Sequence, residues 1–399
     1  MIVAGLAATG VLAPSAKSSS NPVSAASHMP GAIGTLKPLP TATPTPAATL
    51  PPRFAAAGAM ANPRASESAT VLQDGRVLVA GGWIATDKAT NTAEIYDPKI
   101  GAFAATGSMH SARVWQDATL LQDGRVLMTG GSDGHYRVAS AEIYDPKTGH
   151  FTVTGSMAAS RVEHTATLLA DGRVLIAGGY NKGAHLATAE LYNPKTGKFT
   201  KTGSMSTGRG EGAAVLLSDG RVLVMGGNNN AKALGAADVY DPKIGKFTKT
   251  GSMSDARQYT TAVLLNDGRV LVAGGVDTDL VALDSAEIFS SATGTFSKIG
   301  SMTTPRAYGT MTLLSNGSVL IAGGATGDTI LDSAETFDPT TAVFAPTAPL
   351  NDAREFGAAV LLADGSVLIV GGDDGTVDLA SAEIYTDDYG SVTPQTTTS

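Results

Sequence analysis

From about residue 53 onward, short runs of apolar residues alternate with polar turns in the order expected for β-strands. The clearest unit is RVEHTATLLADGRVLIAGGYNKGAHLATAELYNPKTGKFTKTGSM, from Arg161 to Met205. It contains four strand-like runs: HTATLL, RVLIAGG, AELYNP and GKFTKTG. The second run is apolar at nearly every position, which is typical of a strand covered by neighbouring sheets on both faces. The pattern therefore predicts four short antiparallel strands per unit.

This unit occurs seven times at a near-constant spacing. A Gly-Gly pair ends the second run of each copy, with first members at Gly81, Gly130, Gly178, Gly226, Gly274, Gly323 and Gly371. An Asp-Gly or Asn-Gly pair, which tolerates positive φ in a tight hairpin, joins the first and second runs. These pairs begin at Asp74, Asp123, Asp171, Asp219, Asp267, Asn316 and Asp364. Four-stranded units at this period are typical of propeller blades, which bury both faces by packing on one another.

The phase of the repeat predicts how the ring closes. A phenylalanine marks the fourth run of each copy, at Phe54, Phe103, Phe151, Phe199, Phe247, Phe296 and Phe344. The domain therefore begins with a fourth strand near Phe54 and ends with a third strand near Tyr385, so the N-terminal strand should complete the last blade. The competing candidate, GSVT at residues 390–393, lacks the phenylalanine. We predict an all-β, seven-bladed propeller of four-stranded antiparallel blades over residues 53–386, followed by a polar tail at 387–399.

The segments before the repeats have a different composition. Residues 1–16 are apolar, with small residues near Ala13 and Ala16, and resemble the hydrophobic and cleavage regions of a secretory signal, although basic residues after Met1 are missing. We therefore expect a secreted or cell-surface protein. This stretch is too short for a stable transmembrane anchor. Residues 17–52 are rich in Ser, Thr and Pro and are predicted to form an extended linker.

Composition excludes several classes of site. A net charge of -8 and a pI near 5.2 argue against a nucleic-acid partner, because phosphate binding needs a basic face. The absence of cysteine excludes disulfides, thiolate metal sites and cysteine nucleophiles. The oxygen-rich pieces VDTD (276–279) and DDG (373–375) lack a full calcium-ligand series and are interpreted as solvated turns. We expect no metal and no cofactor.

The repeat also carries a family pattern: a double glycine, a later Tyr or Phe, and Arg-x-x-His at the start of the next unit. The last element is complete only at Arg161 and His164. With these motifs the chain resembles the kelch-repeat β-propeller family over about residues 53–386, and DGRVLVAGG with AEIYDP resembles bacterial kelch and galactose-oxidase-like propellers. Kelch repeats normally have Trp where this chain has Phe in the fourth strand. The resemblance does not extend to a galactose-oxidase-like copper site, which needs a cysteine-crosslinked tyrosine.

Each unit has one arginine and one acidic residue at fixed positions. The arginines are Arg64, Arg113, Arg161, Arg209, Arg257, Arg306 and Arg354, and the acids are Glu94, Glu142, Glu190, Asp238, Glu287, Glu335 and Glu383. Because the counts match, we predict a buried ion pair in every blade. A ring of arginines that binds an anion is the alternative.

Strand order places the fourth-to-first and second-to-third connections on one face, the loop face, and the tight turns on the opposite face, the turn face. Loops on a rigid scaffold commonly carry binding residues. Two positions after each arginine, at the mouth of the central channel, lie Ser66, Trp115, Glu163, Glu211, Tyr259, Tyr308 and Phe356. We predict that Trp115, Glu163, Glu211, Tyr259, Tyr308 and Phe356 bind a glycan or protein ligand, since aromatic faces with carboxylates suit both. The alternative is that they only plug the channel.

These observations favour a secreted, non-catalytic binding or scaffold module, with two alternatives. A carbohydrate-active lyase or epimerase could use Glu163 and His164 as an acid-base pair, although adjacent strand residues point to opposite faces. A structural subunit of an extracellular assembly could self-associate through the N-terminal segment near residues 41–50. Uneven charge around the ring could align subunits head to tail, or it could simply form a solvated surface, which is the interpretation we favour. Lysines occur in early blades and acids in late ones, at Lys99, Lys147, Lys195, Lys198, Lys243, Lys246, Asp277, Asp279, Asp328, Asp373, Asp374, Asp387 and Asp388.

Overall fold

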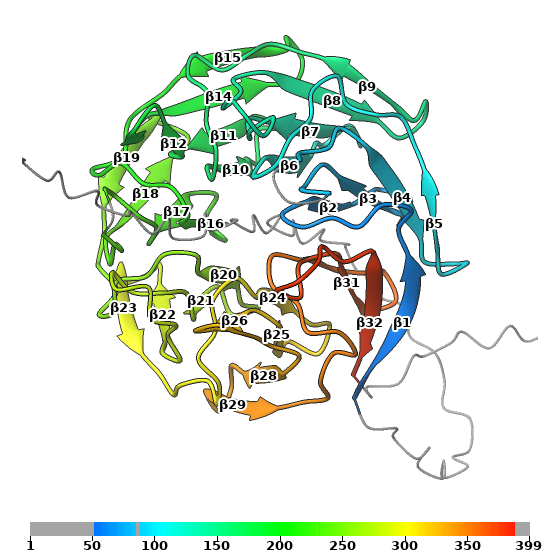
Figure 1. The fold of residues 1–399 in the computed structure, drawn as a ribbon. Coiled ribbons are helices and arrows are strands. Elements are labelled where there is room, and N and C mark those ends of the chain that lie inside the picture. Colours follow the sequence, from blue (N-terminus) through cyan, green and yellow to red (C-terminus); the bar gives the residue numbers. More distant parts are fainter. Residues whose placement is uncertain (1–51, 85–87, 231, 388–399) are drawn as a thin grey trace, which may run out of the picture.

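The computed structural model describes residues 52–84, 88–230 and 232–387, which contain β-strands and no helix. Seven four-stranded antiparallel sheets stand around a central axis (Figure 1). The predicted all-β, seven-bladed propeller is therefore confirmed. Since the described ranges hold no helix, they contain no apolar helix of membrane-spanning length. The predicted signal-like segment, all of the linker except Pro52, and the tail after Asp387 lie outside the described residues.

In each blade the first strand is innermost and the fourth outermost, and the first strands of neighbouring blades contact one another around the axis. The first four blades consist of β2 (Ser68–Val71), β3 (Val77–Ala80), β4 (Ala93–Asp97) and β5 (Ala102–Ala105); β6 (Asp117–Leu120), β7 (Val126–Thr129), β8 (Ala141–Asp145) and β9 (His150–Val153); β10 (Thr165–Leu168), β11 (Val174–Ala177), β14 (Ala189–Asn193) and β15 (Lys198–Lys201); and β16 (Ala213–Leu216), β17 (Val222–Met225), β18 (Ala237–Asp241) and β19 (Lys246–Lys249).

The last three blades follow the same order. They consist of β20 (Thr261–Leu264), β21 (Val270–Ala273), β22 (Ala286–Ser290) and β23 (Thr295–Lys298); β24 (Thr310–Leu313), β25 (Val319–Ala322), β28 (Ala334–Asp338) and β29 (Val343–Pro346); and β30 (Ala358–Leu361), β31 (Val367–Val370), β32 (Ser381–Thr386) and β1 (Arg53–Ala59). Two small hairpins, β12 (Tyr180–Asn181) with β13 (Ala184–His185) and β26 (Ala325–Thr326) with β27 (Thr329–Ile330), lie in second-to-third connections.

The ring closes as the phase of the repeat predicts. Strand β1 pairs antiparallel with β32, with Phe54 opposite Tyr385 and their rings 5.0 Å apart. Figure 1 shows this seam, with β1 in blue beside β32 in red. The last blade thus joins both ends of the domain, which ties the ring shut. The competing GSVT segment lies outside the described residues.

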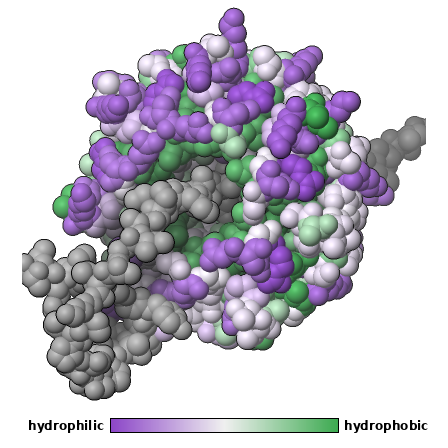
Figure 2. Space-filling view, turned by 180° about the vertical axis from the view of Figure 1, so that it is seen from behind, coloured by the Kyte–Doolittle hydropathy of each residue, from purple (hydrophilic) through white to green (hydrophobic). Residues whose placement is uncertain are grey.

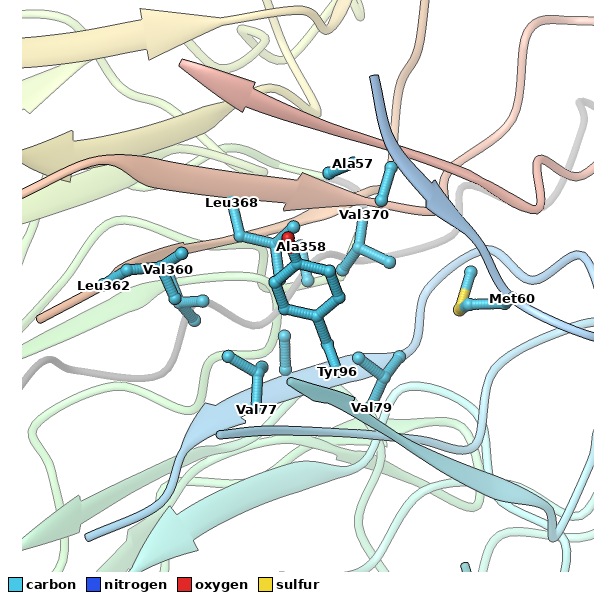
Figure 3. Packing of buried hydrophobic residues seen from close by; sticks show 12 residues of the cluster. Ala57, Met60, Val77, Val79, Tyr96, Ala358, Val360, Leu362, Leu368 and Val370 are labelled. Atoms are coloured by element: carbon cyan, nitrogen blue, oxygen red, sulfur yellow. The ribbon is translucent and has the colours of Figure 1, made fainter. Parts of the chain in front are cut away.

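The hydrophobic core is divided among the seven blade-to-blade interfaces. At the interface of the last and first blades, Val77 and Val79 of β3 face Leu368 and Val370 of β31, and the ring of Tyr96 lies among them (Figure 3). The second strand of every blade is fully buried, as its apolar sequence predicts. Each fully buried Val or Leu side chain stabilises the fold by about 1.5–3 kcal/mol relative to exposure. Packing between sheets therefore supplies most of the stability that a chain without disulfides needs.

The Gly-Gly pair lies where adjacent blades approach most closely. Gly81 and Gly82 have φ of 70° and 96°, and the amide of Gly82 donates to the carbonyl of Arg113 in the next blade at 2.8 Å. A Cβ atom on Gly81 would lie 2.6 Å from that carbonyl oxygen. Only glycine accommodates both the positive φ and this contact.

Each blade contains the predicted ion pair, and in every blade it is buried. In the second blade, Arg113 donates to Glu142 at 3.0 Å and to the carbonyls of Gly130 and Ser140 at 2.8 and 3.0 Å. Glu142 in turn accepts the amides of His110 and Ser111, which begin the incoming connection. The pair therefore joins the fourth-to-first connection to the third strand. The alternative of an anion-binding arginine ring is wrong, because these guanidinium groups are already engaged.

Replacing Arg113 by Ala leaves Glu142 buried without its guanidinium partner. We expect the free energy of unfolding to fall by about 3–5 kcal/mol, because an uncompensated buried charge is costly. The matched control is Arg125→Ala, which breaks the exposed pair of Arg125 with Asp123 and costs at most about 1 kcal/mol. Urea unfolding of both variants measures the difference. Equal losses would contradict a structural role for the buried pair.

Candidate functional site

The fourth-to-first and second-to-third connections lie together on the loop face. In every blade, the residue after the repeat arginine forms a β-bridge with the residue after Gly-Gly: Ala65 with Trp83, Val114 with Ser132, Val162 with Tyr180, Gly210 with Asn228, Gln258 with Val276, Ala307 with Ala325, and Glu355 with Asp373. The loop face is thus a regular platform on which the next residue of each connection is held in place.

That next residue forms a ring, which we call the mouth ring: Ser66, Trp115, Glu163, Glu211, Tyr259, Tyr308 and Phe356. All seven have φ between 51° and 59°, in the left-handed region that bulky L-residues rarely adopt. This conformation costs roughly 1–2 kcal/mol per residue and persists because the frame imposes it. Backbone hydrogen bonds connect five of the seven neighbouring pairs, as from Glu211 to Glu163 at 3.1 Å and from Tyr259 to Glu211 at 3.0 Å. The seven residues of the mouth ring therefore share one backbone conformation.

Five consecutive members of the mouth ring interact through their side chains. The Tyr259 hydroxyl donates to Glu211 at 2.6 Å, and Glu211 is paired with Glu163. The Tyr259 ring lies 4.9 Å from Tyr308, whose ring lies 4.6 Å from Phe356. The sequence-predicted residues from Glu163 to Phe356 thus form one continuous arc. Trp115 is linked to this arc through its carbonyl, which accepts the amide of Glu163 at 3.3 Å, while its indole contacts Trp83.

Glu163 and Glu211 form an acidic pair at the mouth of the channel. Burial and the nearby charge of Glu211 raise the pKa of Glu163 well above its usual range. Burial also raises the pKa of Glu211. Burial and the closeness of two carboxyl groups both favour a proton on the pair, compared with exposed carboxylates. The pair can both donate to and accept from a polar ligand.

The structure does not bring Glu163 and His164 together as an acid-base pair. His164 is buried, and its Nε2 is 2.9 Å from the hydroxyl of Thr129 in the preceding blade. Burial and the charge of Arg161 lower the pKa of His164 to about 3, so the imidazole is neutral. Glu163 instead faces Glu211. His164 packs against Gly130 and stabilises the interface between two blades.

His164 shares its repeat position with Gln116 and Glu67, which sequence analysis did not single out. Gln116 donates to the carbonyl of Ala80 at 2.9 Å across one blade interface. Glu67 occupies the equivalent place at the closing seam, against Gly371. Neither of its carboxylate oxygens has a partner on another residue that the structure describes. Burial raises the pKa of Glu67 to about 8, despite the charges of Arg64 and Arg354 and with a small contribution from Asp378. The Arg-x-x-His pattern was the signal that could have identified it.

The loop face also exposes large apolar side chains near acidic ones. Tyr136, Leu280, Val281 and Val377 are all more than half exposed on second-to-third connections. Arg137 stacks over the Tyr180 ring at 4.5 Å, a contact that the sequence did not predict. Figure 2 views the propeller from the side opposite to that of Figure 1, and on the face drawn there hydrophobic residues border the central hollow and hydrophilic residues gather towards the rim. Among the described residues, no group of three or more His, Asp or Glu side chains could hold a metal ion.

Glu67→Gln should stabilise the protein at alkaline pH, because the amide can donate as Gln116 does without burying a charge. The folded state holds the Glu67 proton more tightly than the unfolded chain, whose pKa is near 4.5. Stability of the wild type therefore falls as the pH rises from about 4.5 to about 8. We expect a gain of about 1–3 kcal/mol at pH values above this window and little gain below it, measured by chemical unfolding. A gain that is independent of pH would contradict this role.

Comparisons with known proteins agree with this geometry. A search of curated proteins found no match. Among solved structures, a fungal alcohol oxidase of the AA5 family in complex with copper is similar, at 21% identity and a TM-score of 0.68, over 84% of this chain and 76% of that one. The kelch motif matches residues 64–109, 118–158, 164–206, 209–254 and 259–303, more than half of the sequence. The chain is therefore a member of the kelch-motif family and folds as a seven-bladed propeller.

Proposed function

We propose that this chain is an exported, non-catalytic binding module whose ligand, a glycan or a protein, binds on the loop face at the mouth ring. The mouth ring carries this proposal: its seven residues share one strained backbone conformation, while their side chains are of five different types. If these positions served only to hold the blades together, the repeated backbone conformation would be enough and varied side chains would not be needed. Variation in side chains on a constant frame is what an asymmetric ligand requires.

The chemistry of the arc supports a binding role. Tyr259 and Tyr308 are half-buried and supply aromatic surface, and the buried Phe356 packs against Tyr308. The Glu163–Glu211 pair supplies hydrogen-bonding groups beside them. Aromatic surface with nearby polar groups suits sugar rings and also protein side chains. The exposed Tyr136 and Leu280 extend an apolar surface outward on the same face.

A lyase or epimerase has less support. An imidazole with a pKa near 3 is a weak general base at physiological pH. His164 is also hydrogen-bonded to the hydroxyl of Thr129. Turnover of an extracellular polysaccharide that is lost in both Glu163→Gln and His164→Gln would favour the enzyme instead. Export rests on the signal-like segment at residues 1–16.

The double variant Trp115→Ala/Tyr259→Ala removes two aromatic members of the mouth ring. We expect it to weaken binding to a glycan array or to displayed peptides by tenfold or more, a loss of about 1.4 kcal/mol. The control is Ile100→Ala/Ile244→Ala, which truncates two exposed side chains on the turn face and should leave binding unchanged. Thermal melting checks that both variants fold. Wild-type binding by the mouth-ring variant would contradict the proposed location.

A second candidate is a subunit of an assembly, which the charge distribution favours. Lys198, Lys201, Lys246 and Lys249 are exposed on the outer strands β15 and β19, whereas carboxylates predominate on the loop face of the last three blades. Complementary edges of this kind can join copies head to tail.

Size-exclusion chromatography tests this candidate. We expect a larger species at low salt that dissociates at high salt, because exposed charges are screened. Lys246→Glu should weaken the larger species. A monomer under both conditions would exclude assembly through these charges.

A further inference from the structure

One part of the mouth ring has buried polar atoms without partners. The indole nitrogens of Trp83 and Trp115 and the hydroxyl of Ser66 have no hydrogen-bond partner among the described residues. Trp83 is 5% exposed and Ser66 is 3% exposed. Buried polar groups are nearly always satisfied in native proteins, and an unsatisfied one is costly. Three such groups in one place are therefore open to a partner that the described residues do not supply.

The three groups come from two adjacent blades and lie side by side. Ala65 and Trp83 exchange backbone hydrogen bonds at 2.8 and 3.1 Å, which places Ser66 next to Trp83. The indoles of Trp83 and Trp115 meet edge to face, with centroids 5.3 Å apart and planes at 83°. We call these three residues the tryptophan arc.

Ser66 has the smallest side chain at the seven mouth-ring positions. Its amide donates to the carbonyl of Phe356 at 2.9 Å, so it continues the same backbone ring. At the positions from Glu211 to Phe356, each large side chain contacts that of the next blade. Ser66 has only a hydroxymethyl group, beside the paired indoles of Trp83 in the same blade and Trp115 in the next.

The chemistry of the tryptophan arc favours an uncharged ligand. An anion would need a cation, yet Arg64 and Arg113 are engaged in buried pairs with Glu94 and Glu142. A cation would instead favour Glu163 and Glu211, farther along the mouth ring. Two indole donors, a hydroxyl group and apolar ring surface match the hydroxyl oxygens and CH faces of a sugar.

We propose that the tryptophan arc binds a neutral sugar residue of a glycan. This inference rests on the proposed binding function and deepens it by naming the ligand class and the three residues that contact it. The sugar hydroxyls accept from the indoles of Trp83 and Trp115 and exchange a hydrogen bond with Ser66.

Trp83 and Trp115 are the two tryptophans of the whole chain, so selectively excited tryptophan fluorescence reports on the tryptophan arc. The probes are cellotetraose, maltotetraose, mannotetraose and the tetramer of N-acetylglucosamine, with tetragalacturonate and spermine as charged comparisons. We expect a saturable change in emission with at least one neutral probe and none with the charged ones. Saturation by spermine or tetragalacturonate alone, or by no probe, would overturn the proposal.

Ser66→Tyr fills the position with a side chain that Tyr259 and Tyr308 show the ring to tolerate. It should weaken binding of the neutral probe by roughly tenfold or more. The matched control is Ser297→Tyr on the exposed strand β23, which should bind as the wild type does. If Ser66→Tyr melts early, Trp83→Phe replaces it: the variant keeps an aromatic ring, loses the N–H and should also bind more weakly. Unchanged affinity in a folded variant would refute the tryptophan arc.

The result can be separated from failure of the proposed function. Glycan or peptide binding that is lost in Trp115→Ala/Tyr259→Ala but unaffected by Ser66→Tyr would refute the tryptophan arc and leave loop-face binding intact. Absence of wild-type binding to every array would refute both.

Discussion

The buried arginine of each blade is the interaction on which the rest of the structure depends. Its guanidinium joins the incoming connection to the end of the second strand and to the acid of the third, as Arg113 does with Gly130 and Glu142. Its carbonyl accepts the amide of a glycine in the preceding blade. One residue thus fixes the order within a blade and the contact between blades. Because the mouth-ring residue lies only two positions later, the same arginine also fixes the backbone at the candidate site.

Features that recur in every unit were predictable from sequence. The Asp-Gly turns and the buried second strands each have a local physical cause, so counting copies predicted seven blades. The position of Phe54 within the repeat predicted that β1 closes the last blade. Matching counts of arginine and acid predicted the buried pairs. Because each unit contacts only its neighbours, the structure of one unit and its two interfaces determines the whole ring.

Features that occur once were less predictable. The repeat pattern of the sequence does not indicate that Trp83 and Trp115, from different blades, meet edge to face. This contact depends on side-chain directions, which the repeat does not specify. Trp115 and Phe356 have a left-handed backbone conformation, which bulky residues rarely adopt. Local propensity would therefore predict a negative φ at both positions. The surroundings of Glu67 were also not predictable from local sequence, because this side chain packs against Gly371 in the last blade. Tertiary context overrides local preference at the places that are candidates for function.

The propeller combines a repeated frame with a variable surface, and we propose that the variable surface binds the ligand. A crystal structure of the protein with a bound neutral oligosaccharide tests this separation most directly. It should show a sugar ring against Trp83 and Trp115, within hydrogen-bond distance of Ser66, and an unchanged arginine frame. A sugar bound to the turn face or the outer strands, with the mouth ring untouched, would contradict it.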